Sequence, residues 1–577
     1  MPRRLSRLAF ALVPAALLLA TCRHVPVRQT VDIGTYLGGE AALAVAQPVF
    51  GAHGMVASNS ELASAAGTEV MKQGGNAVDA AVATGFALAV TYPFAGNIGG
   101  GGFMNIHMAD GRAAAIDYRE VAPLAATRDM YVDAATGKLT NKSVIGHLAS
   151  GVPGAVAGMT EALAKYGSLP LATVMAPAIR LARDGFIVDS ALFRSVRGNR
   201  VISQYAGRDL FYPGGEAIAP GTRLVQADLA RTLEVIAARG AAGFYTGAVA
   251  EALVAEEKRG GGIITLADLS RYKPEWRTPI KSTYRGYTLF TMPPASSGGI
   301  TMTETMNILE TFGPLPRYGS TAYTHLLTEA FRRAFIDRNE KLGDPAFVKV
   351  PLEQLTSKEY ARTLAAGIDR ARATRTPAFR AAGEPEHTTH YSVADAMGNV
   401  VSTTTTLNGG FGSGVWIPKG GFFMNNEMDD FAAQPGSPNM FGLVQGEANA
   451  IVPGKRMLSA MAPTIVLDTD GAVLLVVGAA GGPRIITTTT EVILNVIEHR
   501  MSLADAMRAP RLHHQSLPDT LRYEAGAFSD AVADSLRAMG HALQRGGGLA
   551  NANGIMRVTG GWIGVREPRS TGAAVGY

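Results

Sequence analysis

The sequence predicts an α/β protein in which helices precede a strand-rich C-terminal part. Hydrophobic residues make up 47% of the 577 residues and charged residues only 18%, a composition too apolar for a disordered chain. Residues 150–380 have the pattern of helices separated by glycine and proline, whereas polar and apolar residues alternate after residue 388, as they do in strands. Because the length exceeds that of a usual single core, we expect two lobes or one large enzyme fold.

Two helices are expected near the start of the folded part. Residues 61–72 have helical spacing and end before Gly74, and Asn76 is placed to cap a second helix. That helix contains the apolar run 77–90, which is shorter than the roughly 20 residues that span a bilayer. We therefore predict a buried core helix that packs against the first.

A glycine-rich segment, residues 97–103, leads into an alternating stretch that predicts strands as far as Ile116. Glycine-rich loops can hold phosphate at the start of a helix. This one precedes a strand and lacks the Lys-Ser/Thr pair of a phosphate-binding loop, so we interpret it as structural.

Two adjacent serines, Ser296 and Ser297, follow a strand predicted over 287–291. A serine nucleophile at this turn needs a histidine and an acid, and the chain contains no GxSxG motif. We favour a loop packed under a helix that begins near Ile300, with a serine nucleophile as the alternative.

Four strands are predicted after residue 388, over 391–394, 400–407, 464–467 and 473–478. The second of them contains Ser402 followed by four threonines. Alternate hydroxyl groups of such a strand lie on one face of the sheet.

The N-terminus has the pattern of a secretory signal peptide. Arginines at positions 3, 4 and 7 precede an apolar run over 8–20, too short for a membrane span, so we predict a signal over residues 1–22 and a tether over 23–45. Without those arginines the formal net charge falls from +5 to +2. Because the remaining Lys and Arg are scattered among acidic residues, we expect no nucleic-acid partner. We expect an exported protein of the bacterial periplasm.

The chain has a single cysteine, Cys22, which excludes an intrachain disulfide and a cysteine-based metal centre. Residues 19–22 (LATC) resemble a bacterial lipobox, in which the cysteine is lipidated, although Thr21 stands where Gly, Ala or Ser is usual. A lipid anchor at Cys22 and a soluble exported protein remain alternatives.

The most informative stretch comprises residues 387–393 (HTTHYSV), 398–402 (GNVVS) and 404–412. It resembles the signature segment of the γ-glutamyltransferases, also called γ-glutamyl transpeptidases or glutathione hydrolases, which belong to the N-terminal nucleophile hydrolases. The resemblance covers essentially the whole chain after residue 50. Further matching segments are 117–120, 296–297, 425–431, 455–459, 481–485, 509–511 and 513–514.

The resemblance implies a four-layer αββα sandwich, with helices outside two antiparallel sheets. It also implies autocatalytic cleavage between His387 and Thr388, which divides the precursor into a large chain, 46–387, and a small chain, 388–577, that form a heterodimer. The polar segment 381–386 contains glycine and proline and suits a cleavage point.

A threonine hydroxyl is a weak nucleophile and needs a nearby base. Cleavage gives Thr388 a free α-amino group with a pKa near 8, suited to accept the proton of its own hydroxyl. The resemblance implies that Thr406 orients Thr388 and that the backbone N–H groups of Gly481 and Gly482 form an oxyanion hole. Glycine permits the close backbone approach that such a site needs.

The resemblance implies small-molecule substrates: glutathione or a related γ-glutamyl donor, with water, an amino acid or a peptide as acceptor. The α-carboxylate and α-ammonium of the donor need opposite charges at a fixed separation. Arg119 can bind the carboxylate with a fork of donors, beside Ser459. Asn408, Glu427 and Asp430 can bind the ammonium.

No metal and no organic cofactor are expected. His387 and His390 form an HxxH pattern, but no HExxH motif or nearby acid cluster supports a metal site, so we interpret them as local structure. We interpret His513 and His514 as packing against the core of the small chain.

Two positions depart from the family pattern. Ala460 follows Ser459 where the family has a second serine, and Phe441 stands for a tyrosine in the segment 435–446, which resembles a lid loop. Loss of one hydroxyl donor can weaken carboxylate binding by about 1 kcal/mol. An acylase for glutaryl or cephalosporin-type side-chain amides and an inactive peptide-binding homologue therefore remain alternatives.

Overall fold

The computed structural model describes residues 47–199, 201–205, 207–376 and 388–577. The predicted signal peptide, Cys22, the tether and His387 lie outside these residues.

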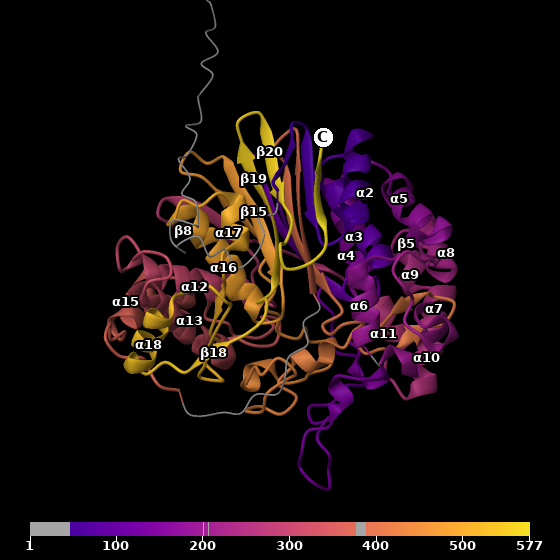
Figure 1. Ribbon diagram of the computed structural model, residues 1–577. Coiled ribbons are helices and arrows are strands. Elements are labelled where there is room, and N and C mark those ends of the chain that lie inside the picture. The colour runs from indigo at the N-terminus through magenta and orange to yellow at the C-terminus, as the bar shows by residue number, and fades with distance from the viewer. Residues whose placement is uncertain (1–46, 200, 206, 377–387) are drawn as a thin grey trace, which may run out of the picture.

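Two seven-stranded antiparallel sheets pack face to face at the centre of the molecule (Figure 1). The first sheet has the order β1 (Val49–Gly51), β20 (Gly561–Val565), β19 (Asn551–Val558), β15 (Val473–Ala480), β14 (Thr464–Leu467), β9 (Tyr287–Thr291) and β8 (Ile280–Tyr284). The second has the order β21 (Ala573–Gly576), β2 (Gly54–Ser58), β10 (Thr388–Asp395), β11 (Val400–Thr406), β3 (Gly101–His107), β4 (Ala113–Asp117) and β7 (Glu275–Arg277).

Helices cover the outer face of each sheet, which confirms the predicted four-layer αββα sandwich. Figure 1 shows α2 (Glu61–Lys72), α3 (Ala77–Thr91) and α4 (Ala155–Tyr166) on one side. On the other side lie α12 (Gly298–Glu310), α13 (Thr321–Lys341), α16 (Arg484–Ile497) and α17 (Leu503–Arg508).

The remaining helices and strands lie around these layers. The helices are α5 (Leu171–Asp184), α6 (Ser190–Gly198), α7 (Arg208–Phe211), α8 (Ala227–Arg239), α9 (Ala242–Tyr245), α10 (Ala248–Gly260), α11 (Leu266–Arg271), α14 (Leu352–Leu355), α15 (Lys358–Ala366) and α18 (Asp530–Met539). The strands are β5 (Phe186–Ile187), β6 (Arg223–Leu224), β12 (Trp416–Ile417), β13 (Phe422–Phe423), β16 (Leu512–His513), β17 (Leu521–Tyr523) and β18 (Leu543–Arg545).

The layers follow from the alternation of side chains along the central strands. In β2, Met55 joins an apolar cluster between the sheets, whereas Val56 packs towards the helices. Ala394 and Val393 of β10 divide in the same way. Each central strand is therefore buried on both faces, as the period of two requires.

Each sheet contains strands from both sides of residue 388 that pair with one another. β2 pairs with β10, and β11 pairs with β3. In the other sheet, β9 pairs with β14. The parts of the chain before and after residue 388 therefore cannot separate without breaking both sheets.

The predicted pair of N-terminal helices is confirmed. Asn76 caps α3 by accepting hydrogen bonds from the N–H groups of Val78 and Asp79, and the side chain of Asp79 accepts from the N–H of Asn76. All residues of α3 are buried, so this apolar helix belongs to the core. Gly74 has a φ of 95°, a conformation in which glycine ends the preceding turn without strain.

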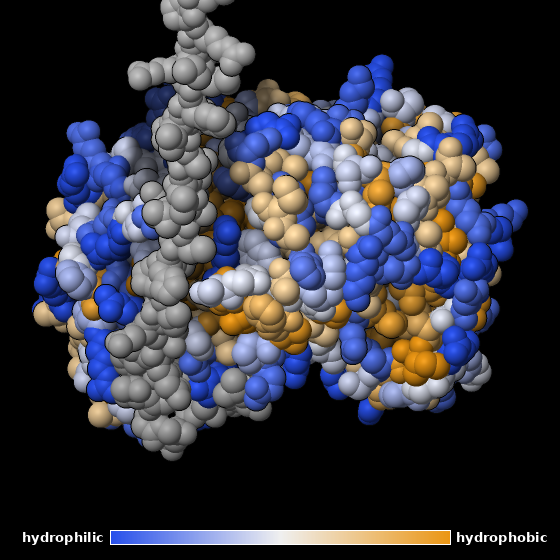
Figure 2. All heavy atoms as spheres, turned by 90° about the horizontal axis from the view of Figure 1, so that it is seen from above, coloured by the Kyte–Doolittle hydropathy of each residue, from blue (hydrophilic) through white to orange (hydrophobic). Residues whose placement is uncertain are grey.

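The surface of the molecule is coloured by hydropathy in Figure 2. Figure 2 shows one face, on which polar residues predominate and apolar residues form separate patches. Within the described ranges, no helix combines the length and hydropathy that crossing a membrane requires.

Substitution of Asp79 tests the junction of α3 with the segment after α4. Its buried carboxylate accepts hydrogen bonds from the N–H groups of Ser168 and Leu169 as well as from Asn76. Asp79→Ala leaves these donors buried without an acceptor, so we expect the free energy of unfolding to fall by about 3 kcal/mol. Thermal or urea unfolding measures this loss. A smaller loss is expected for Asp79→Asn, which keeps one acceptor oxygen, and equal stability of the alanine variant and the wild type would contradict this account.

Candidate active site

One cavity of about 310 Å³ of empty space brings together the predicted site residues. Of the predicted site residues that the structure describes, all except Gly481 line it, and Gly481 immediately precedes Gly482 in the wall. Residues far apart in the sequence therefore meet at one place. The lining residues are Arg119, Arg338, Thr388, Thr406, Asn408, Glu427, Asp430, Phe441, Leu443, Ser459, Ala460, Met461, Gly482, Pro483 and Ile485.

Thr388 is the first residue of β10 and lies opposite Thr406 in β11. The two Oγ1 atoms are 3.3 Å apart, and the N–H of Asn408 donates to Thr406 Oγ1 at 2.7 Å. Asn408 has a φ of 75°, so the chain turns sharply after β11 and returns its N–H to that hydroxyl. This arrangement holds one hydroxyl against another at the cavity wall.

The face of β11 that carries Thr406 is polar, as the alternation predicts. Ser402 Oγ donates to the carbonyl of Val477 in the opposite sheet, and Thr404 Oγ1 is 2.9 Å from His390 Nδ1. His390 also contacts Ser392 Oγ through Nε2. Burial lowers the pKa of His390 to about 3, so it is neutral at physiological pH and serves this hydrogen-bond network.

Gly481 and Gly482 form the turn between β15 and α16, with φ angles of 139° and 56°. A Cβ at Gly482 would lie 2.8 Å from the ring of Phe441, so a larger residue does not fit there. Among the described residues, neither N–H has a hydrogen-bond acceptor. Two free donors at the start of a helix provide a site for negative charge.

Buried charges form the opposite wall of the cavity. The guanidinium of Arg119, just after β4, donates to Glu427 Oε1 and Asp430 Oδ2, and its Nε donates to the carbonyl of Met457 at 3.3 Å. Burial raises the pKa of Glu427 and Asp430, against the opposing effect of Arg119. The cation and the anions predicted to bind substrate are thus paired with one another.

Glu120 adds a further buried carboxyl beside this cluster. Its Oε2 lies 3.8 Å from the Arg119 guanidinium, and neither oxygen has a hydrogen-bond partner in the described part of the chain. Burial raises the pKa of Glu120 to about 8, so it is mainly protonated at pH 7. The neutral form keeps the excess of negative charge in the cluster small.

The serine loop supports the wall that carries Ser459. Ser296 Oγ donates to the carbonyl of Met461 and Ser297 Oγ donates to that of Ser459. Both serines are fully buried just before α12. The loop therefore packs as predicted, and the alternative of a serine nucleophile is wrong because both hydroxyl groups are engaged by backbone carbonyls.

The lid-like segment closes over the two glycines. Phe441 is 3% exposed and its carbonyl accepts from Gln515 Nε2, while the N–H of Met440 donates to Asp429 Oδ2 at 2.9 Å. Ala460 also lines the cavity. Both departures from the family pattern therefore face the space that a ligand would occupy.

One lining residue, Arg338, was not predicted from the sequence. It lies on α13 and is 1% exposed. Long stretches of chain separate it from the residues that were predicted. The sequence around it is an ordinary helical pattern with charged residues, so no local signal distinguished it from a surface arginine.

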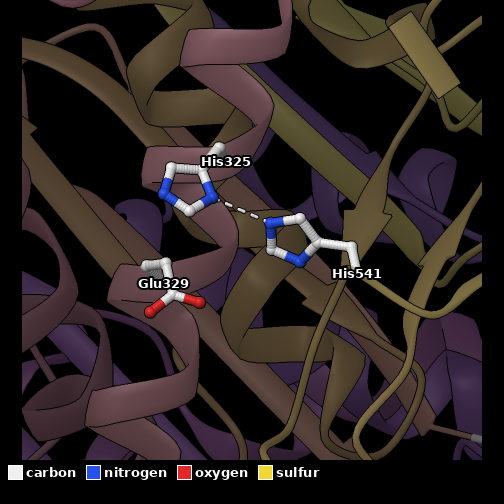
Figure 3. A group of neighbouring side chains, drawn as sticks. All are labelled: His325, Glu329 and His541. Atoms are coloured by element: carbon white, nitrogen blue, oxygen red, sulfur yellow. Dashed lines mark hydrogen bonds between the residues drawn. The ribbon is translucent and has the colours of Figure 1, made fainter. Parts of the chain in front are cut away.

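Three side chains that offer metal-ligating atoms lie together outside the cavity lining: His325, Glu329 and His541 (Figure 3). His325 Nδ1 is 2.8 Å from His541 Nε2, and His325 Nε2 is 2.8 Å from the carbonyl of Asp369. Because that carbonyl only accepts, His325 donates from Nε2 and its Nδ1 accepts from His541. The two rings thus form a neutral hydrogen-bonded pair between α13 and the segment after α18.

The carboxylate of Glu329 is engaged elsewhere. Arg332 and Arg333 form ion pairs with it, at 3.3 Å and 2.6 Å. Two guanidinium groups at this point disfavour a divalent cation, so the donor set fits a hydrogen-bonded structural contact better than a metal site.

His513 likewise has structural contacts. Its Nδ1 lies 3.0 Å from Thr487 Oγ1 and its Nε2 lies 2.8 Å from Gln515 Oε1. His514 is buried beside it and contacts Asp519 at 3.3 Å. Both histidines pack in the part of the chain after residue 388, as predicted.

Comparison with known proteins gives consistent matches over most of the chain. The sequence profile described as Gamma-glutamyltranspeptidase matches residues 63–577. The chain is 47% identical over 536 residues to a glutathione hydrolase proenzyme of Escherichia coli (strain K12), with 91% of this chain and 92% of that protein covered. It is 43% identical over 512 residues to the acylase ACY 1 proenzyme of Pseudomonas sp. (strain SE83), with 86% and 88% covered. Among solved structures, a cephalosporin acylase from Bacillus halodurans superposes with a TM-score of 0.82 at 30% identity, over 92% of this chain and 97% of that one.

The pKa of Asp429 predicts a pH dependence of stability. Burial raises this pKa to about 6, whereas an unfolded aspartate titrates near 4. The folded state therefore binds more protons between these values, and the wild type loses stability relative to Asp429→Asn as the pH rises from 4 to 7. Over this range, the free energy of unfolding of the wild type relative to Asp429→Asn is expected to fall by at most about 3 kcal/mol. Unfolding at each pH measures it, with Asp470→Asn at an exposed turn as the control, and a difference that does not vary with pH would refute the assignment.

Proposed function

The chain belongs to the γ-glutamyltranspeptidase family of enzymes, and from this premise we propose that it transfers the γ-glutamyl group of glutathione or a related compound to water, an amino acid or a peptide. The transfer passes through an ester on Thr388 Oγ1. The observation that carries this proposal is the cavity itself, in which Thr388 faces a buried set of opposite charges and two glycine N–H donors.

Maturation comes first. The hydroxyl of Thr388 attacks the carbonyl carbon of His387, the peptide bond becomes an ester, and water hydrolyses that ester. His387 then ends in a carboxylate and Thr388 begins with a free amine. The position of Thr388 at the very start of β10 supports this, because the strand holds the new terminus at the cavity after the cut.

Transfer then uses the same hydroxyl. The free α-amino group, with a pKa near 8, accepts the hydroxyl proton as the oxygen attacks the γ-carbonyl carbon. Thr406 orients the nucleophile, and the N–H groups of Gly481 and Gly482 stabilise the negative oxygen of the tetrahedral intermediate. The amine of the donor leaves with a proton, and water or an acceptor amine later cleaves the ester.

The charged wall selects the donor. Arg119 and Ser459 bind the α-carboxylate, while Glu427, Asp430 and Asn408 bind the α-ammonium. The protein groups already pair with one another, and a zwitterion gives Arg119 and the acids further partners of opposite sign without adding net charge. Its ammonium also favours the ionised form of the two acids, whose pKa values burial raises.

The two chains stay together after cleavage. Strands from before and after residue 388 pair with one another in both sheets, so separation would expose both cores. We therefore propose a heterodimer of residues 46–387 and 388–577 as the active species. The basic and apolar pattern of residues 1–22 supports export to the periplasm, either soluble or with a lipid anchor at Cys22.

Substitution of Thr388 tests both reactions. The wild type is expected to give two bands on a denaturing gel that co-migrate in gel filtration, and to hydrolyse γ-glutamyl-p-nitroanilide. Thr388→Ala is expected to remain one uncut chain and to have no measurable turnover, because it lacks the attacking oxygen. Thr389→Ala is the matched control, since its neighbouring hydroxyl contacts Asn59 and does not line the cavity. A wild-type chain that persists uncut after purification would instead support an inactive peptide-binding homologue.

A second candidate function is side-chain amide hydrolysis by an acylase. Ala460 and Phe441 in the cavity wall favour it, and relatives named as acylases reach 43% identity. Comparison of glutaryl-p-nitroanilide, which lacks the α-amino group, with γ-glutamyl-p-nitroanilide decides between them. We expect kcat/KM for the glutamyl compound to be at least about tenfold higher, since the ammonium contacts are worth more than 1.4 kcal/mol. Equal or better turnover of the glutaryl compound would overturn the glutamyl assignment.

A further inference from the structure

Arg338 connects the two walls of the cavity. Its guanidinium is buried on α13, where Nε donates to Ser297 Oγ at 3.0 Å and one terminal nitrogen contacts Gln445 Oε1 at 3.4 Å. Among the described residues it has no carboxylate within ion-pair distance, in contrast to Arg119. The same terminal nitrogen also donates to Asn339 Oδ1 at 2.8 Å. A guanidinium with neutral partners at two of its nitrogens is suited to hold those partners at a fixed separation.

The first of these contacts leads to Ser459. Ser297 Oγ accepts from Arg338 and donates to the carbonyl of Ser459, and the N–H of Ser297 donates to the same carbonyl at 2.8 Å. Ser459 in turn donates its N–H to the carbonyl of Ala295 at 3.0 Å. The position of the Ser459 backbone therefore depends on a serine that Arg338 holds in place.

The second contact leads to Asp430. Gln445 Oε1 accepts from Arg338, and its Nε2 donates to the carbonyl of Asp430 at 3.1 Å. Asn449 Nδ2 reinforces this link by donating both to that carbonyl, at 2.7 Å, and to Gln445 Oε1, at 3.0 Å. The backbone of Asp430 thus depends on an amide that Arg338 orients.

The charge of Arg338 also acts on Asp430. Burial lowers the pKa of Arg338 to about 10, so the group stays protonated at pH 7, and the Asp430 carboxylate opposes the lowering. Arg338 in return counteracts the rise that burial causes in the pKa of Asp430. Two cations therefore balance the acidic side of the pocket: Arg119 by direct contact, and Arg338 by its charge from beyond ion-pair distance.

We propose that Arg338 is a positioning residue that fixes the distance between the carboxylate-binding wall, at Ser459, and the ammonium-binding wall, at Asp430. This rests on the proposed function, since it assigns the two walls to the two α-substituents of a γ-glutamyl donor. The chemical class so selected is an acyl group with a carboxylate and an ammonium on one carbon atom.

Three small ligands separate the two walls. Glutamate carries both α-substituents, glutarate lacks the ammonium, and 4-aminobutanoate lacks the α-carboxylate. Isothermal titration calorimetry on the purified two-chain enzyme gives the Kd of each ligand without any need for turnover. Hydrolysis of γ-glutamyl-p-nitroanilide is measured separately and reports on the proposed function alone.

The variants break the contacts one at a time. Ser297→Ala is expected to raise the Kd of glutamate and of glutarate about tenfold and to leave the Kd of 4-aminobutanoate unchanged. Gln445→Leu is expected to raise the Kd of glutamate and of 4-aminobutanoate by a similar factor and to leave the Kd of glutarate unchanged. Arg338→Met should raise the Kd of all three ligands. Arg338→Lys keeps the charge but cannot reach both partners, so its Kd values should lie between those of Arg338→Met and those of the wild type.

Arg333→Met is the control, because Arg333 lies on the same helix but contacts Glu329 and the carbonyls of Leu364 and Gly367. We expect it to lower the melting temperature without changing any Kd. The proposal is overturned if Arg338→Met keeps wild-type Kd values, if Ser297→Ala and Gln445→Leu change all three ligands alike, or if the wild type binds none of them. Normal binding patterns with no turnover of the γ-glutamyl compound would refute the proposed reaction and leave the role of Arg338 supported.

Discussion

The pairing of β10 with β11 at Thr388 and Thr406 is the constraint on which the rest of the site depends. In this register, Thr388, Ser392 and Ala394 face the first sheet, while Val393 faces the helices. A slip of one residue would turn every side chain to the other face, burying the Thr388 hydroxyl against α3 and bringing the apolar side chains between the sheets. The hydrophobic pattern of the strand therefore fixes the position of the hydroxyl that we propose as nucleophile.

Around that hydroxyl, the structure concentrates polar groups that are costly to bury. Arg119, Glu427 and Asp430 compensate one another, and a protonated Glu120 limits the excess of negative charge. Such a cluster is a poor source of stability, because its desolvation cost offsets most of the attraction between the charges. We propose that it is instead suited to a ligand that carries both signs of charge, such as the α-carboxylate and α-ammonium of an amino acid.

The sequence was sufficient for elements whose pattern is local. The helices α2 and α3, with their cap at Asn76, and the strand β14 follow from spacing and capping alone. The family segments located Thr388, Thr406 and the two glycines. Strands such as β19 and β20 were not predicted, because their short alternating runs contain glycines and gain their stability from neighbours in the sheet. Arg338 and Glu120 were missed for a related reason, since burial is a property of the packed molecule and not of a residue type.

By itself, the sequence determined the α/β class, because this depends on residue types and short-range spacing. Through its resemblance to a family, it also indicated the hydroxyl that we propose as nucleophile and the charges that we propose to bind an amino acid. The tertiary structure alone decided that Arg119 pairs with both acids, that Arg338 lines the same cavity, and that the parts before and after residue 388 share both sheets. These facts depend on contacts between segments separated by hundreds of residues. The packing of the layers sets the distances across these contacts.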